Sequence, residues 1–392
     1  MSKLFKTLRN LFIVLATIYV ALFALTSVIR YPEPISSIRL ALAPASKTPF
    51  LMPAHTIAPS ASKHPWAIGA PEVPETVMWN KEKISFDSFL ERTQTNAFLI
   101  IRDGAITYEK YRNGKSESSL LPSYSVAKTM TSLMIGKLIS EGKLKESDTF
   151  VSVLPEFKAG TNFDQVKISD LLDMSGGVAA LDNYPDGPAG WGVAIAQMYA
   201  TTDLNYFMKN NRRMDSTPGT KADYRSIDTQ MLGMVIKKIT GEKLADYFSK
   251  SFWAPVGAEY AATWNVDRIG GQEKTFCCFN AAARDYARMG QLLLNNGASS
   301  IGGANLIDAN WMKRLTTSKV TLDRNWGYGA QIWHPYSDSN LMMGLHGQYV
   351  FIEPSTHTVI VKLSDEPTKN GDNESYTAAV LHDIARTLPS KK

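Results

Sequence analysis

The chain has 392 residues, of which 44% are hydrophobic and 20% charged, enough for the core of one large or two ordinary domains. Its net charge of +5 falls to +2 without the three basic residues of the first ten (39 Lys and Arg against 37 Asp and Glu), and no basic run follows, so we expect no nucleic-acid partner. No C-x-x-C or H-E-x-x-H motif occurs, and we therefore expect neither a metal site nor a cofactor.

Residues 11–29 (LFIVLATIYVALFALTSVI) carry no charge and follow Lys3, Lys6 and Arg9. A helix of this length approaches the ~30 Å thickness of the hydrocarbon core of a bilayer. The basic flank predicts a cytoplasmic N-terminus and an extracytoplasmic, periplasmic remainder. A cleaved signal peptide is the alternative, but its apolar core is usually only ~7–15 residues long. We favour an uncleaved membrane anchor over residues 1–30.

Residues 41–77 are rich in Pro, Ala and Ser. Such a composition buries too little apolar surface to fold alone, and its prolines favour extended backbone. We interpret residues 31–83 as a linker, either a tether or a strap lying over the next domain, and residues 84–392 as that domain.

The domain opens with a predicted hairpin, in which strands over 96–101 and 105–111 flank a turn at Asp103-Gly104. Apolar residues then recur at helical spacing from Val126 to Ile139. This pattern predicts a long buried helix that begins near Ser125.

Ser125-Val126-Ala127-Lys128, at the start of that helix, is an S-x-x-K motif. Residues three apart share a helix face, ~5–6 Å apart at Cβ, so the hydroxyl and the ammonium lie side by side. A serine becomes a useful nucleophile when a base takes its proton, and a lysine with a lowered pKa can be that base. It can instead stay charged and lower the pKa of another base. The motif alone is equally compatible with a capping serine and a solvated lysine.

A helix is expected next over 168–174, followed by an irregular Gly- and Pro-rich loop at 179–193. After Tyr224-Arg225-Ser226 we expect a helix through Met231, Leu232, Val235 and Ile236 to Gly241, and further helices over 244–252 and 281–295. After Trp326 the pattern predicts strands over 328–334, 341–346, 349–352 and 358–363, then a closing helix over 375–388. Strands at both ends of the domain predict an α+β fold, in which an antiparallel sheet flanked by helices carries an inserted, mainly helical subdomain.

Cys277 and Cys278 are the two cysteines of the chain, and they are adjacent. Disulfide geometry prefers Cα atoms further apart than neighbours are, so we expect them to stay unbridged and to act as small buried apolar residues.

The ordered set of motifs resembles the serine β-lactamase and penicillin-binding superfamily. The closest likeness is to its class C-like branch, which includes esterases, D-aminopeptidases and 6-aminohexanoate-oligomer hydrolases. The resemblance covers about residues 85–390. It rests on the S-x-x-K at 125–128, LLDMSGG at 171–177, Pro218-Gly219 with Tyr224-Arg225-Ser226, AAARDYARMG at 281–290, and His346-Gly347.

Three positions depart from the family pattern. Met174 replaces a common His, Ser226 a common Asn, and His346 stands where a Lys is frequent. The last two departures favour the amidase and esterase side of the superfamily over an efficient β-lactamase.

The resemblance implies a role for each motif. Ser125 is the expected nucleophile, and Tyr224 accepts or relays its proton, with the cation of Lys128 lowering the pKa of the tyrosine. The Ser125 N–H forms half of an oxyanion hole, and the strand after His346-Gly347 supplies the other half, most simply the Gln348 N–H. His346 is expected to bind a substrate carboxylate or to orient the lysine and tyrosine; a structural histidine at a strand end is the alternative.

Tyr184 lies in the loop at 179–193, where 6-aminohexanoate-oligomer hydrolases carry a tyrosine that closes over the substrate. The resemblance implies that Tyr184 donates a proton to a leaving amide nitrogen; an ordinary loop aromatic is the alternative. The loop's glycines suit a mobile lid.

Together these features predict an exported serine hydrolase that forms an acyl-enzyme on a small amide or ester. A peptidoglycan-directed D,D-peptidase or D-aminopeptidase is the alternative, as is a non-catalytic penicillin-binding protein that keeps the fold.

Overall fold

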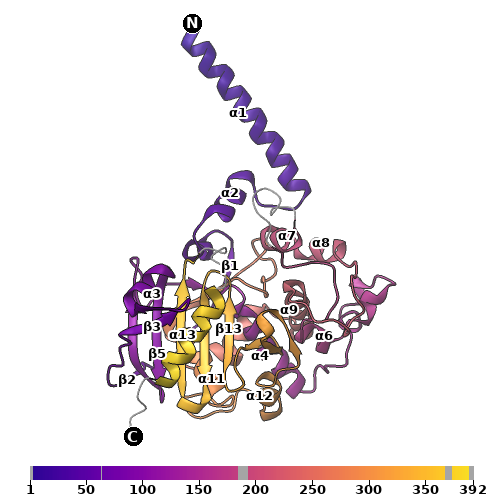
Figure 1. The fold of residues 1–392 in the computed structure, drawn as a ribbon. Helices are drawn as coiled ribbons and strands as arrows, with labels where there is room; N and C mark the ends of the chain where they lie inside the picture. The colour runs from indigo at the N-terminus through magenta and orange to yellow at the C-terminus, as the bar shows by residue number, and fades with distance from the viewer. Residues whose placement is uncertain (1–2, 63, 184–192, 367–372, 388–392) are drawn as a thin grey trace.

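The computed structural model describes residues 3–62, 64–183, 193–366 and 373–387. Its first helix, α1 (Lys3–Val28), projects from the body of the molecule and has no buried residue (Figure 1). It is the one helix in the described ranges that is long and apolar enough to cross a membrane.

A nine-stranded sheet forms the centre of the body, with strand order β10-β11-β12-β13-β14-β15-β5-β6-β2. Its pairs are antiparallel except β2 with β6. The front hairpin joins the C-terminal strands where β5 pairs with β15, Ile100 opposite Ile360. The sheet is therefore built from both ends of the domain, as the sequence predicts. Its strands are β2 (Ala67–Ile68), β5 (Thr95–Arg102), β6 (Ala105–Tyr111), β10 (Val320–Thr321), β11 (Gly327–Gly329), β12 (Ile332–His334), β13 (Asn340–Gly344), β14 (Gln348–Glu353) and β15 (Thr358–Ser364).

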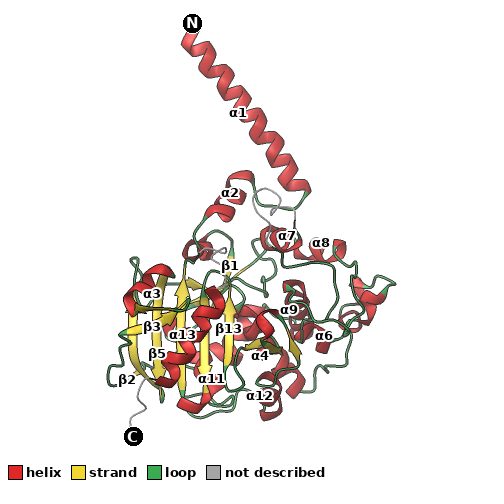
Figure 2. Ribbon diagram, viewed as in Figure 1, coloured by secondary structure: helices red, strands yellow, loops and turns green. Residues whose placement is uncertain are grey.

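Helices cover both faces of this sheet (Figure 2). α11 (Ala283–Leu294) packs on β14, β15 and β5, whereas α3 (Phe86–Arg92) and α13 (Asn373–Thr387) belong to the apolar cluster of the opposite face. Strands β5 and β14 are buried along their whole length, because side chains of both faces meet a helical layer.

The segment between the two halves of the sheet is mainly helical, which confirms the α+β prediction. α4 (Val126–Ser140) lies at its centre and is almost wholly buried, packed against α9 (Ser226–Thr240). Besides α11, the other helices of this region are α5 (Phe150–Val153), α6 (Ile168–Leu172), α7 (Ala194–Ala200), α8 (Leu204–Asn210), α10 (Leu244–Phe248) and α12 (Ala309–Leu315).

Residues 31–83 lie against the domain as a strap with short elements of its own. Ser46, in a 3₁₀ turn, donates from its backbone N–H and hydroxyl to the carboxylate of Asp365, at 2.6 and 2.8 Å. A second sheet, in the order β1-β8-β9-β7, joins the strap to the domain. The strap contains α2 (Pro34–Leu42), β1 (Ala54–Ile57) and β3 (Thr76–Trp79), and β4 (Glu82–Ser85) begins at its end. The domain contributes β7 (Leu121–Pro122), β8 (Ala262–Asn265) and β9 (Phe279–Ala281) to the second sheet.

Two expectations from the sequence are wrong. The strand expected over 328–334 is a hairpin of β11 and β12, because Ala330 and Gln331 take positive φ angles of 48° and 69° and turn the chain. Cys277 and Cys278 are buried as expected, but they are bridged to each other. Cys278 has a φ of 71°, and the turn it makes brings the two sulfur atoms together.

Candidate active site

The S-x-x-K motif begins α4. Tyr124 takes a positive φ of 44°, which turns the chain sharply, so that Ser125 becomes the N-cap of the helix. Ser125 is half-buried, whereas the helix behind it is buried. Its backbone N–H donates no hydrogen bond within the described part of the chain. The hydroxyl thus stands at a helix start, where free N–H groups and the helix dipole favour developing negative charge.

Lys128 lies one helical turn on and is only 1% exposed. Its Nζ donates to Ser125 Oγ at 3.1 Å, to Ser226 Oγ at 2.9 Å and to the carbonyl of Phe276 at 2.9 Å. Burial lowers the pKa of Lys128 to about 8, against a raising effect of the carboxylates of Asp182 and Asp228. Lys128 can therefore give up its proton near neutral pH and accept another from Ser125.

Tyr224 comes to the same hydroxyl from the segment just before α9. The Ser125 side chain lies close enough to the Tyr224 phenol to lower its pKa, and the Tyr224 ring stacks on Trp333 at 5.4 Å. Burial raises the pKa of Tyr224, so the expectation that Lys128 lowers it is wrong. Lys128 Nζ lies over the Tyr224 ring, 5.1 Å from its centroid, and not beside the hydroxyl. Burial removes water from the hydroxyl, which disfavours the phenolate and raises the pKa. Tyr224 is consequently protonated in the resting site.

Asp182 extends this network, and the sequence analysis missed it. Its carboxylate accepts from the Ser226 N–H at 2.8 Å and from Ser226 Oγ at 2.5 Å. Ser226, which stands where the family often has Asn, thus still accepts a hydrogen bond from Lys128. Its own hydroxyl donates to the carboxylate of Asp182. The signal in the sequence was an Asp shortly after the Ser-Gly-Gly turn, and only the fold shows that this loop reaches α9.

Gly344, the last residue of β13, lies against the backbone of the nucleophile. A Cβ atom on Gly344 would fall 2.3 Å from the Ser123 carbonyl oxygen and 2.9 Å from the Ser125 nitrogen. The next residue, Leu345, is half-buried, and its N–H has no hydrogen-bond partner among the described residues. The strand edge therefore brings a second free N–H into the neighbourhood of Ser125.

The structure places His346 and Gly347 in the turn between β13 and β14, not on a strand, with φ angles of 63° and 77°. The His346 ring packs on Tyr124, 4.9 Å between centroids, and Nδ1 bonds the carbonyl of Glu366 at 2.8 Å. Burial lowers the pKa of His346, which keeps it neutral at pH 7. His346 thus packs against the residue that precedes the nucleophile, and its hydrogen bond to Glu366 holds the turn in place.

Gln348 is 0% exposed, and its side chain is used inside the domain. Nε2 donates to the carbonyls of His346 and Ser364, both at 2.8 Å. This residue ties the turn to β15 and pairs with Gly344 across β13 and β14, whereas Leu345 follows Gly344 in the turn. Tyr184, the expected lid residue, lies outside the described residues.

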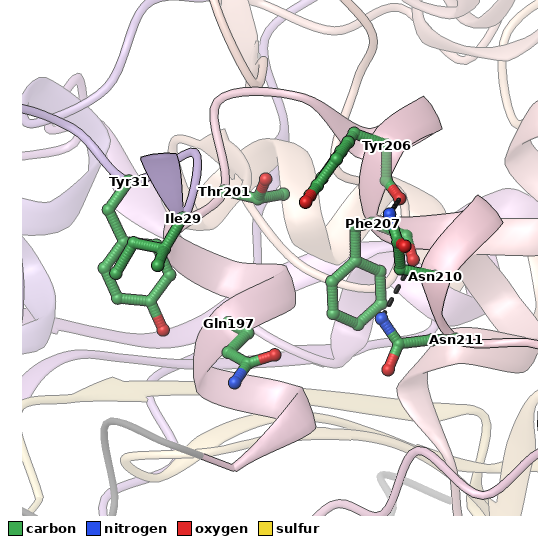
Figure 3. Close-up of a pocket in the computed structure, with 8 residues that line it drawn as sticks. All are labelled: Ile29, Tyr31, Gln197, Thr201, Tyr206, Phe207, Asn210 and Asn211. Atoms are coloured by element: carbon green, nitrogen blue, oxygen red, sulfur yellow. Dashed lines mark hydrogen bonds between the residues drawn. The ribbon is translucent and has the colours of Figure 1, made fainter. Parts of the chain in front are cut away.

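Two other features lie apart from Ser125. A cavity of about 390 Å³ lies between the end of α1 and helices α7 and α8, lined by residues that include Ile29, Tyr206 and Asn211 (Figure 3). Asp338, Glu353 and His382 offer ligand atoms within 4.8 Å of one another beside α13. His382 Nε2 is 3.9 Å from an oxygen of each carboxylate, too far for a hydrogen bond.

A serine at a helix start, a buried lysine one turn on and a tyrosine from the segment before a second helix define a serine hydrolase. The comparisons agree: a family model described as "Beta-lactamase" matches residues 86–383. The chain belongs to the beta-lactamase family.

Among curated proteins, 6-aminohexanoate-dimer hydrolase of Paenarthrobacter ureafaciens is 27% identical over 325 residues, covering 76% of this chain and 80% of the relative. A protein of Escherichia coli K12 named "Putative D-alanyl-D-alanine carboxypeptidase" is 25% identical over 394 residues, covering 79% and 87%.

Among solved structures, "Putative 6-aminohexanoate-dimer hydrolase from Bacillus anthracis" has a TM-score of 0.78 at 24% identity and covers 91% of this chain and 95% of its own. A family VIII carboxylesterase has a TM-score of 0.55 at 17% identity and covers 73% and 91%. These likenesses establish the fold. Because the Bacillus anthracis structure covers 91% of this chain, its likeness includes much of the segment before residue 84.

Proposed function

We propose that this chain is a membrane-anchored, extracytoplasmic serine hydrolase that hydrolyses a small amide or ester through an acyl-enzyme on Ser125. The observation that carries the proposal is the position of Ser125 Oγ, 3.1 Å from the Nζ of a buried lysine and beside the phenol of Tyr224. Residues 1–30 are the anchor, 31–83 the connecting segment and 84–392 the catalytic domain.

In the first step, Ser125 Oγ attacks the carbonyl carbon and its proton passes to neutral Lys128. The carbonyl oxygen becomes negative and accepts from the N–H groups of Ser125 and Leu345, neither of which has a hydrogen-bond partner in the described part of the chain. Tyr224, protonated at rest, passes a proton to the leaving amine or alcohol and is reprotonated from Lys128. Water then attacks the acyl-enzyme by the same route in reverse, and Ser125 is regenerated.

A small linear amide is the favoured substrate class. The supporting observation is that relatives named 6-aminohexanoate-dimer hydrolase match along most of both chains. A D,D-peptidase or D-aminopeptidase acting on peptidoglycan is the second candidate, favoured by the relatives named as D-alanyl-D-alanine carboxypeptidases.

A fluorophosphonate probe on the purified full-length protein tests the nucleophile. Wild type and Ser364→Ala are expected to label and Ser125→Ala to stay unlabelled; Ser364 is the matched control because it also bonds a buried lysine. Equal labelling of wild type and Ser125→Ala would refute the assignment. A panel of p-nitrophenyl esters, D-amino-acid amides, nitrocefin and aminohexanoate dimer then ranks the substrate classes.

The intact mass of the protein recovered from membranes tests the anchor. A protein that retains residues 1–30 supports it, and one that begins after Thr26 shows cleavage instead.

A further inference from the structure

Apolar side chains stay exposed on α2, the short helix that follows α1. Ile35, Ile38 and Leu42 are 50%, 47% and 77% exposed. Their spacing of three and four residues puts them on one side of the helix, and the other side, which includes Leu40, is buried. α2 therefore packs on the domain through one face and turns an apolar face outward.

Another exposed apolar residue lies near the end of α1. Ile269 is 91% exposed, in the loop between β8 and β9. The neighbouring Arg268 donates to the carbonyl of Thr202 at 2.9 Å, and the Thr202 N–H donates to the carbonyl of Arg30 at 2.7 Å. Two hydrogen bonds thus connect this loop to the residue where the chain leaves α1.

The start of α2 is folded back beside α1. The Tyr19 hydroxyl donates to Glu33 Oε2 at 3.0 Å, and the Glu33 carboxylate caps α2 by accepting the N–H groups of Ile35 and Ser36. Tyr19 lies nine residues before the end of α1, roughly 14 Å back along the helix axis. Figure 1 shows α2 at the level of the lower part of α1, above the body. With α1 across a bilayer, α2 lies alongside the half of α1 that crosses the outer leaflet.

We propose that the outward face of α2 and the Ile269 loop dock on the surface of the bilayer, with their apolar side chains in the interfacial layer and Arg30 and Arg39 beside lipid phosphates. The inference goes beyond the proposed function but rests on its membrane anchor. An amphipathic helix with basic residues next to its apolar face is the usual form of such a contact. A second copy of the chain would also cover an apolar face, but the bilayer is already brought to this one by α1.

The docked face lies close to the nucleophile. Ser37, Leu40 and Tyr199 of α7 line one small cavity under α2. Tyr199 also lines the pocket that contains Tyr124, the residue before Ser125. Docking through α2 thus holds the active site two side-chain layers from the membrane surface, where an amphiphilic substrate would be concentrated.

Spin labels on the full chain in nanodiscs of phosphatidylcholine and phosphatidylglycerol test the proposal. Single variants Ile38→Cys, Leu42→Cys and Ile269→Cys carry a nitroxide, and Ile68→Cys on distant β2 is the control, since Ile68 is also 73% exposed. Val14→Cys reports separately on α1. The measurement is collision with oxygen, which enriches in lipid, against a water-soluble nickel chelate.

Labels at 38, 42 and 269 are expected to collide several-fold less with the nickel chelate than the label at 68, and more with oxygen. If these three match the label at 68 while the label at 14 lies in lipid, docking is wrong and the anchor stands. If the label at 14 is also in water, the anchor fails and docking with it. Spin–spin broadening at 42 would assign the face to a second copy and would overturn the proposal.

Discussion

Lys128 and Lys362 are both buried lysines that bond a serine hydroxyl. Nζ is 3.1 Å from Ser125 Oγ in the first pair and 2.6 Å from Ser364 Oγ in the second. Burial lowers the pKa of each lysine to about 8, and nearby carboxylates raise it in both cases. By charge state and hydrogen bond alone, the two pairs look alike.

They differ in what surrounds the serine. Ser125 is half-buried at a helix start, with a free N–H and a tyrosine hydroxyl beside it. Ser364 is 1% exposed inside β15, and its N–H is taken by Gln348. The rings of Phe89 and Tyr349 lie 5.8 and 5.5 Å from Lys362 Nζ. A lowered lysine pKa therefore does not make a nucleophile; access and donors for the oxyanion are needed as well.

Replacing each lysine by methionine should separate the pairs most strongly. Lys128→Met removes the base and is expected to lower kcat/KM for a p-nitrophenyl ester by about 10³-fold or more, within the range for general-base loss. Lys362→Met should stay within about threefold of wild type per folded molecule, because a base that touches no substrate contributes only to packing. Comparable losses in both variants, with circular dichroism unchanged, would contradict the distinction.

Tyr224 and Tyr328 give a second, smaller contrast between a reacting and a packing group. Their rings meet edge to face at 5.9 Å, but the Tyr224 phenol lies beside Ser125, whereas the Tyr328 hydroxyl is buried without a partner among the described residues. Tyr224→Phe should lower kcat by about 10²-fold through loss of the proton relay. Tyr328→Phe removes an unsatisfied hydroxyl and should leave kcat unchanged and stability equal or higher. A Tyr224→Phe variant with full kcat would remove the tyrosine from the mechanism.

The sequence predicted the residues whose partners are local. Ser125 and Lys128 are three apart on one helix, so helical geometry alone joins them. The pairing of the front hairpin with the last strands also followed from the order of the elements. Tyr224 was found through a family motif and not through any local pattern.

The remaining features depend on tertiary contacts that spacing does not encode. Asp182 reaches Ser226 across 44 residues, and the end of β13 lies against the Ser125 backbone because Gly344 has no side chain. The direction of the Tyr224 pKa shift depended on whether Lys128 lies over the ring or beside the hydroxyl. The cysteine bridge depended on a positive φ at Cys278, which an isolated pair of letters does not reveal.

The pH dependence of the rate sharpens the comparison, because both lysines titrate near the same pH. Lys128 acts as a base only when neutral, so kcat/KM should rise about tenfold per pH unit below its pKa and level off above about 8. Lys362→Met should keep this rising limb, although it removes a group that titrates in the same range. If kcat/KM of Lys362→Met no longer rose with pH, Lys362 and not Lys128 would control the rate.

The smallest expected effect comes from the acids that tune the two lysines. The Asp182 carboxylate raises the pKa of Lys128, and Glu366 does the same for Lys362. Asp182→Asn keeps an acceptor for Ser226 but removes the charge, so the pKa of Lys128 should fall and the rising limb should move to lower pH. Glu366→Gln should lower only the pKa of Lys362 and leave the limb in place. Ser226→Ala tests the hydrogen bonds instead, because it removes the bond to Lys128 and one of the two bonds that Asp182 accepts while it keeps the Asp182 carboxyl group in place. If Asp182→Asn moved the limb to higher pH, or Glu366→Gln moved it equally, the rate would not be reporting a lysine held by Asp182, and the network at Ser125 would have to be assigned anew.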